Sequence, residues 1–477
     1  MSNALLHEVA SWKLEAKLED NSRYFFHINI VDKITSGSKS YVIGRKGTGK
    51  TAITEHITKE ISYSRFAKKL SFKNFPFQDL YNLKNDSYTT PNQYITLWKY
   101  LIYSSVAKLM IKNEGIDSSV REQLAKIYAD DIEQSLARSI KRWVSGGFKI
   151  SILGSGVEAN GSSSAQKNET SWVERVEALE DILLKYLDDS EYLIVFDELD
   201  EDYRDVMDPS NYKRYTDLLT SLFKAVQDVR SVFSEGRKLF PVVFLRDDIY
   251  EVLMDPDRNK WNDLKVALEW DEVSIKDLLA FRLSKANSPT DTPYSFRDAW
   301  RMMFLNSPVK YGHKQQKEMN TFDYITRSTQ LRPRDYIRYL QACAEEALRL
   351  GQMEITPEVV TKIDKAFSNY LRNEIEDEIN GIIPDIKSVL NIFSIVRKQT
   401  LSIAEFEVAY EEAVQSGEVQ ARSTDFLLRI LFNFSVIGNQ PTQKNKHVFR
   451  YLTPEANFNR KEPIVLHRGL FKSLQII

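Results

Sequence analysis

Short apolar runs separated by longer segments of helical pattern dominate the first 270 residues of the chain. The runs lie at residues 40–44, 69–72, 192–196, 240–245 and 264–270. Compact apolar runs of this length, such as residues 192–196, are typical of strands buried on both sides. Parallel strands need long crossover connections, and the intervals between these runs are long. The pattern therefore predicts an α/β domain with a largely parallel sheet.

The interval between the second and third runs is far longer than one crossover needs. Residues 93–113 and 120–144 repeat apolar positions at helical spacing, so we expect a helical insertion at about residues 75–190. Within it, residues 154–170 are rich in Gly, Ser and other polar residues, which favours a mobile loop or hairpin. Its Gly-Ser-Gly has no apolar strand before it and no Lys-bearing helix after it, so a second phosphate loop is not predicted.

The pattern becomes helical after residue 270. Apolar positions recur at helical spacing at residues 271–285, 322–350 and 357–379, which predicts a helical domain over residues 271–379. A chain of 477 residues exceeds what one hydrophobic core organises, so several domains are expected. Residues 1–270 are predicted to form the first of them.

The last hundred residues combine helical and β-like patterns. Helical spacing at residues 382–398, 403–416 and 424–434 precedes short β-like pieces at residues 435–437 and 448–452. Three helices followed by a β-hairpin are the parts of a winged helix-turn-helix. A third domain of this kind is therefore predicted over residues 380–477.

A glycine-rich loop stands between the first apolar run and the helical pattern that follows it. In such a loop, backbone N–H groups surround phosphate oxygens, the Lys50 ammonium binds the β and γ phosphates, and the Thr51 hydroxyl coordinates Mg²⁺. The setting of strand, loop and helix predicts a nucleotide site with ATP and Mg²⁺ as cofactors; the alternative is a tight turn with a surface lysine. The loop comprises Gly44, Arg45, Lys46, Gly47, Thr48, Gly49, Lys50 and Thr51, which match the pattern GxxxxGK followed by Ser or Thr.

Two acidic residues, Asp197 and Glu198, follow the strand predicted at residues 192–196. Because parallel strands end at the same edge of a sheet, these acids are expected beside the glycine-rich loop. Asp197 then suits the Mg²⁺ shell, and Glu198 suits the orientation of the attacking water. The alternative is a strand that ends in a solvated acidic loop, since Asp200 and Glu201 follow.

Arg246 follows the apolar run at residues 240–245 and is expected at the same edge of the sheet. A cation there could contact the γ-phosphate and stabilise the charge that develops on it during phosphoryl transfer. The alternative is an arginine that forms an ion pair with Asp247 or Asp248 at the end of its strand.

Two further arginines, Arg332 and Arg334, stand where a helix is expected to begin at Pro333. Either could reach the nucleotide from a lid formed by the helical domain. The alternative is an ordinary surface helix.

Composition and charge narrow the classes of function. The 65 Lys and Arg against 67 Asp and Glu give a net charge of −2, so no whole-protein field favours nucleic acid or an anionic membrane. Cys343 is the only cysteine, which excludes a disulfide within the chain and a thiolate metal cluster. No run approaches the roughly 18 consecutive apolar residues that a membrane span needs, so a cytoplasmic protein is expected.

The motifs, in their order along the chain, resemble the AAA+ and STAND branch of P-loop ATPases. They are the strand with GRKGTGKT, then YLIVFDE, FPVVFLRDD, the helical segment with RPRD and the terminal winged-helix pattern. More narrowly, residues 25–477 are similar to a bacterial group of STAND-like ATPases that also resemble origin-recognition initiators. The resemblance implies a five-stranded P-loop NTPase sheet, a first sensor at Arg246, and a helical lid with a second sensor at Arg332 or Arg334. The long insertion departs from a minimal module of this family.

Two functions follow from this resemblance. The first is an ATP-driven molecular switch that self-assembles when nucleotide binds; many such bacterial proteins are thought to act against phages or other mobile DNA. The sequence has no nuclease, TIR-like or protease motif, so a toxic activity would belong to a separately encoded effector. The second is an initiator-like or loader ATPase that binds DNA through its winged helix. A nucleotide-binding scaffold without turnover is a third alternative, and Glu198 argues against it.

Local charge bears on whether DNA is bound. Residues 421–477 hold nine Lys and Arg against three acids, an excess of six that can serve phosphates. The expected recognition helix at residues 424–434 is mostly apolar and has Arg429 as its only cation, whereas base reading needs several polar side chains on one face. Lys444, Lys446 and Arg450 of the expected wing would contact phosphates. Weak, salt-sensitive and non-specific DNA binding is the most that is predicted.

Overall fold

The five predicted strands form one parallel sheet in the order β2-β3-β4-β1-β5. The expected P-loop NTPase fold class, an α/β fold with a parallel sheet, is confirmed. The last strand is shorter than the run predicted at residues 264–270, because the chain leaves the sheet to enter a helix that Asp271 caps. The strands are β1 (Tyr41–Ile43), β2 (Arg65–Ser71), β3 (Glu191–Asp197), β4 (Lys238–Leu245) and β5 (Lys265–Ala267).

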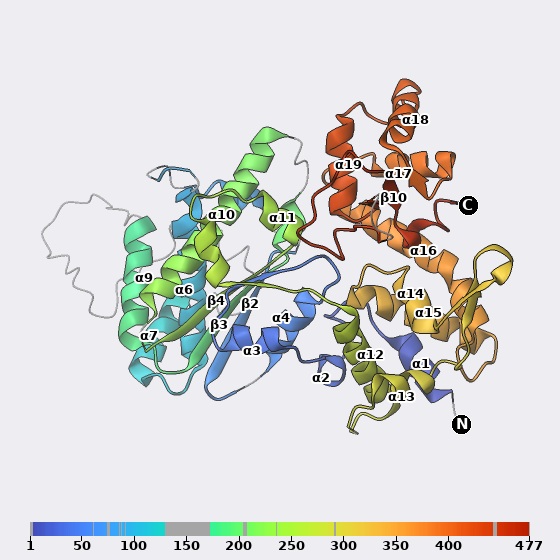
Figure 1. Cartoon of the computed structure of the whole chain (residues 1–477). Helices are drawn as coiled ribbons and strands as arrows, with labels where there is room; N and C mark the ends of the chain where they lie inside the picture. The colour runs from blue at the N-terminus through green and yellow to red at the C-terminus, as the bar shows by residue number, and fades with distance from the viewer. Residues whose placement is uncertain are drawn as a thin grey trace, which may run out of the picture. The chain divides into compact units, whose positions relative to one another are not determined.

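The computed structural model divides into two compact units (Figure 1). The sheet unit comprises His27–Arg45 and Lys50–Leu268, and the helical unit comprises Met1–Phe26, Lys46–Gly49 and Glu269–Ile477. The structure describes residues 3–60, 62–73, 77–84, 86, 88–90, 92–128, 172–203, 208–234, 236–290, 292–441 and 446–476.

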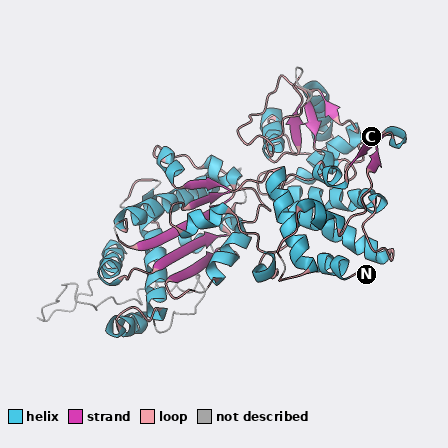
Figure 2. Ribbon diagram, turned by 60° about the horizontal axis from the view of Figure 1, so that its bottom comes forward, coloured by secondary structure: helices cyan, strands magenta, loops and turns pink. Residues whose placement is uncertain are grey.

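Helices cover both faces of the sheet, which is why its central strands are apolar throughout (Figure 2). Every residue of β3 after Glu191 is buried. Tyr41 of β1 is also buried, and its hydroxyl donates to the Phe223 carbonyl at 2.8 Å. The helices of this unit are α3 (Asn29–Thr35), α4 (Lys50–Lys59), α5 (Phe77–Tyr81), α6 (Ile95–Lys112), α7 (Ser118–Tyr128), α9 (Trp172–Tyr186), α10 (Pro209–Val232) and α11 (Asp247–Val252).

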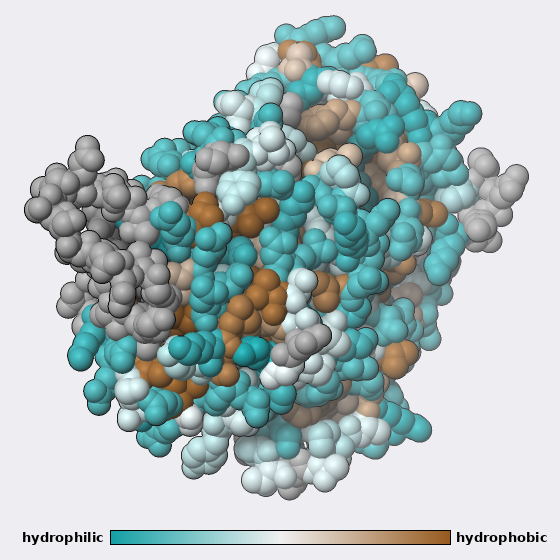
Figure 3. Space-filling model, turned by 90° about the vertical axis from the view of Figure 1, so that its left-hand side faces the viewer, coloured by the Kyte–Doolittle hydropathy of each residue, from teal (hydrophilic) through white to brown (hydrophobic). Residues whose placement is uncertain are grey.

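The segment predicted as a helical insertion supplies α5, α6, α7 and α9. Helix α6 is buried along most of its length, and the Trp98 indole N–H donates to the Leu218 carbonyl of α10 at 2.8 Å. In Figure 3, hydrophilic side chains predominate on the described surface, and apolar residues show between them in several small groups. The part of the predicted helix beyond Tyr128 and the Gly/Ser-rich stretch at residues 154–170 lie outside the described residues.

The helical unit contains helices in each segment predicted between residues 271 and 379, but residues 322–350 form two helices, α14 and α15, instead of one. Pro333 and Pro357 occupy the first turns of two of them, where a missing N–H costs no hydrogen bond. No helix among the described residues is both long and apolar enough to cross a membrane. The elements are α12 (Glu272–Asn287), α13 (Phe296–Arg301), the hairpin of β6 (Val309–Tyr311) and β7 (Lys317–Met319), α14 (Thr321–Thr326), α15 (Pro333–Arg349) and α16 (Pro357–Ile379).

The first residues of the chain belong to the helical unit rather than to the sheet. Helix α1 (Ala4–Ser11) packs against α12 and α15, and α2 (Asn21–Tyr24) packs against α12. Arg282 of α12 is buried, forms an ion pair with Glu19 at 2.6 Å and lies 4.5 Å above the Trp12 ring. This corrects the predicted first domain of residues 1–270, because sequence periodicity shows that a helix has an apolar face without showing what covers it.

The C-terminal region contains three helices and a three-stranded antiparallel sheet in the order β8-β10-β9. Helix α19 buries four of its apolar side chains, those of Leu427, Leu428, Leu431 and Phe432. The β-like piece predicted at residues 448–452 is wrong as a strand: Val448 makes a single bridge to Asn439, and β9 pairs with β10 instead. Lys444 lies outside the described residues. The elements are α17 (Ile386–Val396), β8 (Thr400–Leu401), α18 (Ile403–Gln415), α19 (Thr424–Asn433), β9 (Ile437–Asn439) and β10 (Ile464–Leu466).

Candidate nucleotide-binding site

The glycine-rich loop begins where β1 ends and finishes at the first residues of α4. The Gly44 N–H donates to the Leu245 carbonyl of β4 at 3.1 Å, which anchors the start of the loop to the sheet. Gly47 and Gly49 have φ angles of 82° and 100°, a region in which glycine is far less strained than other residues. The tight turn of the motif therefore requires these glycines.

Lys50, the first residue of α4, is held against the loop that precedes it. Its ammonium donates to the carbonyls of Gly44 at 2.7 Å and Arg45 at 2.9 Å. Burial lowers the pKa of Lys50, and the nearby carboxylates of Asp200 and Asp247 act in the opposite direction. The ends of β3 and β4 thus place their charged residues around Lys50.

The Asp197 carboxylate at the end of β3 is buried and fully held by its neighbours. Its Oδ2 accepts a hydrogen bond from the Thr54 hydroxyl at 3.0 Å and lies 2.8 Å from the Lys69 ammonium. Its Oδ1 accepts a hydrogen bond from the Glu198 backbone N–H at 3.0 Å. The carboxylate predicted to bind the metal therefore has a fixed orientation in the protein itself.

Lys69 on β2 was not identified from the sequence. It contacts Asp197 and also the Glu55 carboxylate of α4, at 3.1 Å. Burial alone would lower the pKa of Lys69, but the two carboxylates outweigh burial and raise it. Alternation along β2 puts Lys69 and Ser71 on one face, yet only the pairing with β3 shows that this face meets the acids.

Glu198 has an unusual backbone conformation for a residue with a side chain. Its φ of 63° and ψ of 35° lie in the left-handed region, which strains non-glycine residues and is often found at functional sites. Its carboxylate accepts a hydrogen bond from the Ser71 hydroxyl of β2. Ser71 thus positions the acid that was predicted to orient water.

The oxygen donors at this edge suit Mg²⁺. Mg²⁺ binds hard oxygen ligands and keeps several waters, with one or two carboxylates and substrate phosphates completing its shell. The Asp197 carboxylate and the Thr51 hydroxyl at the second position of α4 supply that chemistry. These residues would hold the metal, and Mg²⁺ would neutralise phosphate charge there.

Arg246 forms the ion pair that was the alternative to a sensor role, with Asp248 rather than with Asp247. Two of its guanidinium nitrogens donate to the two Asp248 oxygens at 3.0 and 2.7 Å, and a third lies 3.5 Å from Asp200. The positive charge of Arg246 also acts on Lys50. Arg246 is therefore both an ion-pair partner of Asp248 and a neighbour of Lys50, and its role as first sensor stays a prediction.

Arg332 is almost fully buried, so the surface-helix alternative is wrong for this residue. Its guanidinium forms ion pairs with Asp335 at 3.1 Å and with Glu378 at 2.8 Å. It also donates to the Lys46 carbonyl in the glycine-rich loop, at 3.4 Å. Arg332 therefore joins α15, α16 and the tip of the loop within the helical unit.

Arg334 lies closer to the surface and contacts the same loop. Its backbone N–H donates to the Gly47 carbonyl at 3.4 Å, and its guanidinium pairs with Glu374 at 3.2 Å. Lys46 approaches the same carboxylate to 3.5 Å. A second sensor at either arginine stays a prediction; the structure places both beside residues 46–49.

Sequence comparison finds a family match only in the helical unit. A family model described as the FunZ-associated C-terminal helical domain matches residues 274–376. This segment runs from α12 to near the end of α16. No curated protein matches the chain.

Structure comparison finds distant similarity to initiator proteins. The ORC1 protein of Aeropyrum pernix in complex with DNA is 12% identical with a TM-score of 0.40, over 97% of this chain and 96% of that chain. The ORC2 protein of the same organism, in ADPNP-ADP complexes, is 12% identical with a TM-score of 0.40, over 94% and 90%. ORC of Drosophila bound to DNA is 12% identical with a TM-score of 0.29, over 100% and 92%. Similarity this remote assigns no function.

Proposed function

We propose that the protein binds ATP with Mg²⁺ and hydrolyses it. The observation that carries this proposal is the gathering of charge around Lys50. The carboxylate of Asp197 and the guanidinium of Arg246 both act on the Lys50 ammonium at the carboxyl edge of the sheet. Lys50 begins α4, Asp197 ends β3 and Arg246 follows β4. The fold, and not one sequence motif, therefore brings these three residues close together.

Each residue has a role in phosphoryl transfer. Lys50 binds the β and γ phosphates, and Thr51 with Asp197 holds Mg²⁺. Glu198, positioned by Ser71, orients the attacking water, and Arg246 stabilises charge on the γ-phosphate. ATP-dependent release of phosphate by the purified protein, lost in Lys50→Ala, tests the activity.

The narrower proposal is a STAND-like switch whose assembly follows the nucleotide. The sequence resemblance supports it, and so does the placement of charged residues such as Asp200 beside Lys50. A switch of this kind would act in the cytoplasm with a separately encoded effector, in conflict with phages or other mobile DNA. The winged-helix interpretation of the C-terminal region belongs to the same proposal, and its order of helices and strands supports it.

ATP with Mg²⁺ is expected to increase self-association, because nucleotide in related architectures binds near subunit edges. Light scattering at micromolar concentrations in nucleotide-free, ADP and slowly hydrolysed ATP-analogue states measures the mass. Lys50→Ala is the control, since it should keep one mass in all three states. An unchanged monomer mass for the wild type would contradict assembly.

The second candidate function is an initiator-like ATPase that binds DNA through the C-terminal region. The structure reduces the charge available for it, because several of the cations counted there are paired with acids. Three of the acids, Asp364, Asp385 and Glu407, lie before residue 421. The charge excess of residues 421–477 therefore did not include them. The pairs are Arg422 with Asp385, Arg429 with Asp425, Arg460 with Glu407 and Arg468 with Asp364.

Alanine at Lys444, Lys446 and Arg450 is expected to weaken any DNA binding by a similar factor for every sequence, because phosphate contacts carry no sequence information. Fluorescence anisotropy with unrelated DNA duplexes at two salt concentrations measures this. Basal ATPase activity should stay unchanged in the same variant. A tight complex with one DNA sequence at physiological salt would favour the initiator-like function.

A further inference from the structure

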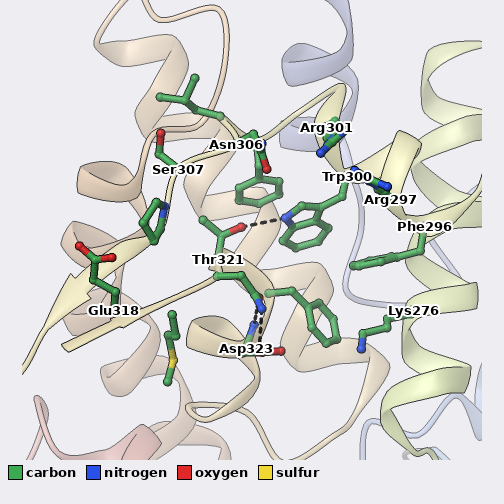
Figure 4. Close-up of a pocket in the computed structure, with 16 residues that line it drawn as sticks. Lys276, Phe296, Arg297, Trp300, Arg301, Asn306, Ser307, Glu318, Thr321 and Asp323 are labelled. Carbon is green, nitrogen blue, oxygen red and sulfur yellow. Dashed lines mark hydrogen bonds between the residues drawn. The ribbon is translucent and has the colours of Figure 1, made fainter.

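A pocket of about 610 Å³ opens in the helical unit, between α13, the base of the β6-β7 hairpin and the start of α14 (Figure 4). Its volume falls within the range of about 300–1,000 Å³ that is typical of sites for small organic ligands. All of its lining residues come from the segment 276–323. It lies within the FunZ-associated family match and uses none of the residues of the candidate nucleotide site.

Four aromatic rings form one wall of the pocket. Trp300 and Phe304 stack at 4.1 Å between ring centroids with an interplanar angle of 5°. Phe296 and Phe322 meet edge to face at 5.1 Å. The Trp300 indole N–H donates to the Thr321 hydroxyl at 2.8 Å, shown dashed in Figure 4, so α13 is tied to α14. Trp300, Phe304 and Phe322 are themselves buried, at 8%, 1% and 3% exposure, so the half-buried Phe296 supplies the ring face that is open to a ligand.

Two arginines lie beside the aromatic wall. Arg297 and Arg301 are four residues apart on α13, so both project from one helix face. Figure 4 draws both on the same side of the pocket as Trp300, with Glu318 on the opposite side. Both arginines are exposed, and no ion pair joins either guanidinium to a carboxylate in the part of the chain that the structure describes. The pair can therefore bind an anion.

We infer that this pocket binds a nucleotide unit, with its base against Phe296 at the open side of the aromatic wall and its phosphate on Arg297 and Arg301. Bases stack on aromatic side chains, and guanidinium groups bind phosphate oxygens in pairs. Glu318 on the opposite side can accept a hydrogen bond from an exocyclic amine of a base. The nucleotide is either free or part of a single-stranded nucleic acid, because both offer the same base and phosphate.

The rim of the pocket favours a nucleotide over an apolar peptide. Among the described residues that line the pocket, Leu305 is the one large hydrophobic residue that is exposed, at 41%. A helix or strand of a protein partner would need a longer apolar groove to bury its anchor residues. Here the apolar surface is confined to a ring-sized wall, and the rim above it is charged.

The test uses full-length protein with Lys50→Ala, so that the glycine-rich loop contributes no binding. The probes are a fluorescein-labelled single-stranded DNA of twelve nucleotides, read by anisotropy, and AMP, read by calorimetry. Arg297→Glu with Arg301→Glu should weaken binding by at least about tenfold, because two charge-assisted contacts become repulsive. Lys365→Glu with Lys387→Glu makes the same change of charge at exposed positions away from the pocket and should leave the affinity within about twofold.

A second variant separates stacking from charge. Phe296 is only partly buried, so Phe296→Ala should leave the fold intact and still weaken binding by about fivefold or more through lost stacking. Binding of AMP with this dependence identifies a free nucleotide as the ligand, and binding of the DNA strand alone identifies single-stranded nucleic acid; both support the inference.

Several results would overturn the inference. One is that neither probe binds, at millimolar AMP or micromolar DNA. Another is that the Arg297 and Arg301 variant binds the probes with the same affinity as its parent. A third is that the control variant loses as much affinity as the Arg297 and Arg301 variant. Competition by inorganic phosphate alone, at the same concentration as AMP, would reduce the site to a simple anion site. Arginine-dependent binding of a labelled Asp- and Phe-rich peptide, with no nucleotide binding, would assign the surface to a protein partner. None of these outcomes depends on whether the protein hydrolyses ATP.

Discussion

Replacing Glu198 by Gln is expected to keep ATP binding and to lower turnover by at least about a hundredfold. The amide has the shape of the carboxylate and can still contact Ser71, but it cannot polarise the attacking water in the same way. Lys50→Ala is expected to fail one step earlier, because it removes the cation that binds the phosphates. The two variants therefore separate chemistry from binding.

Binding is measured with a fluorescent ATP analogue, and turnover is measured by phosphate release with saturating ATP and Mg²⁺. Ser71→Ala is the matched control, because it removes the hydrogen bond that positions Glu198 but keeps its carboxylate. It should lower the turnover number less than Glu198→Gln does and leave the affinity for ATP unchanged. Equal turnover in the wild type and in Glu198→Gln would remove Glu198 from the proposed mechanism.

Replacing Arg332 by Met is expected to lower the free energy of unfolding by about 3–5 kcal/mol, because it removes the guanidinium that forms ion pairs with the carboxylates of Asp335 and Glu378 away from solvent. Met keeps most of the volume of the aliphatic part of the arginine side chain. The loss of stability therefore measures the removal of the charge and not the creation of a cavity. Urea unfolding monitored by circular dichroism measures the change.

Arg334→Met is the control for this prediction. Its side chain is 29% exposed and its ion pair with Glu374 is partly solvated, so a loss below about 1 kcal/mol is expected. If Arg332→Met instead kept full stability and weakened only ATP binding, Arg332 would act as a sensor and not as a structural ion-pair partner.

The sheet and the loop could be predicted because their signals are local. A buried parallel strand has an apolar run, and the glycine-rich loop has fixed residue spacing, so Gly44, Lys50 and Asp197 were placed correctly at one edge of the sheet. Strand β5 was predicted too long because Trp270 extends the apolar run, although the chain has already left the sheet there.

Contacts between distant segments could not be predicted. Lys69 looks like an ordinary polar residue of a strand until the register of β2 against β3 is known. Arg332 looks like a surface residue at a helix start, and its burial depends on Glu378, 46 positions later in the chain. In the C-terminal region, β10 was not predicted from the sequence and lies well beyond the piece predicted at residues 448–452. The segment between them has no periodic pattern that would indicate a strand.

The contact between Lys69 and Asp197 also has an evolutionary consequence. Asp197 and Glu55 both contact Lys69, and Glu55 also pairs with Lys59 at 2.9 Å. A change at position 69 alone would remove the cation that lies between two neighbouring carboxylates. Positions 55, 69 and 197 are therefore expected to covary among relatives of this protein. A lineage that loses the lysine should also lose the acid at position 55, because the acid at position 197 is the one that we propose to bind the metal.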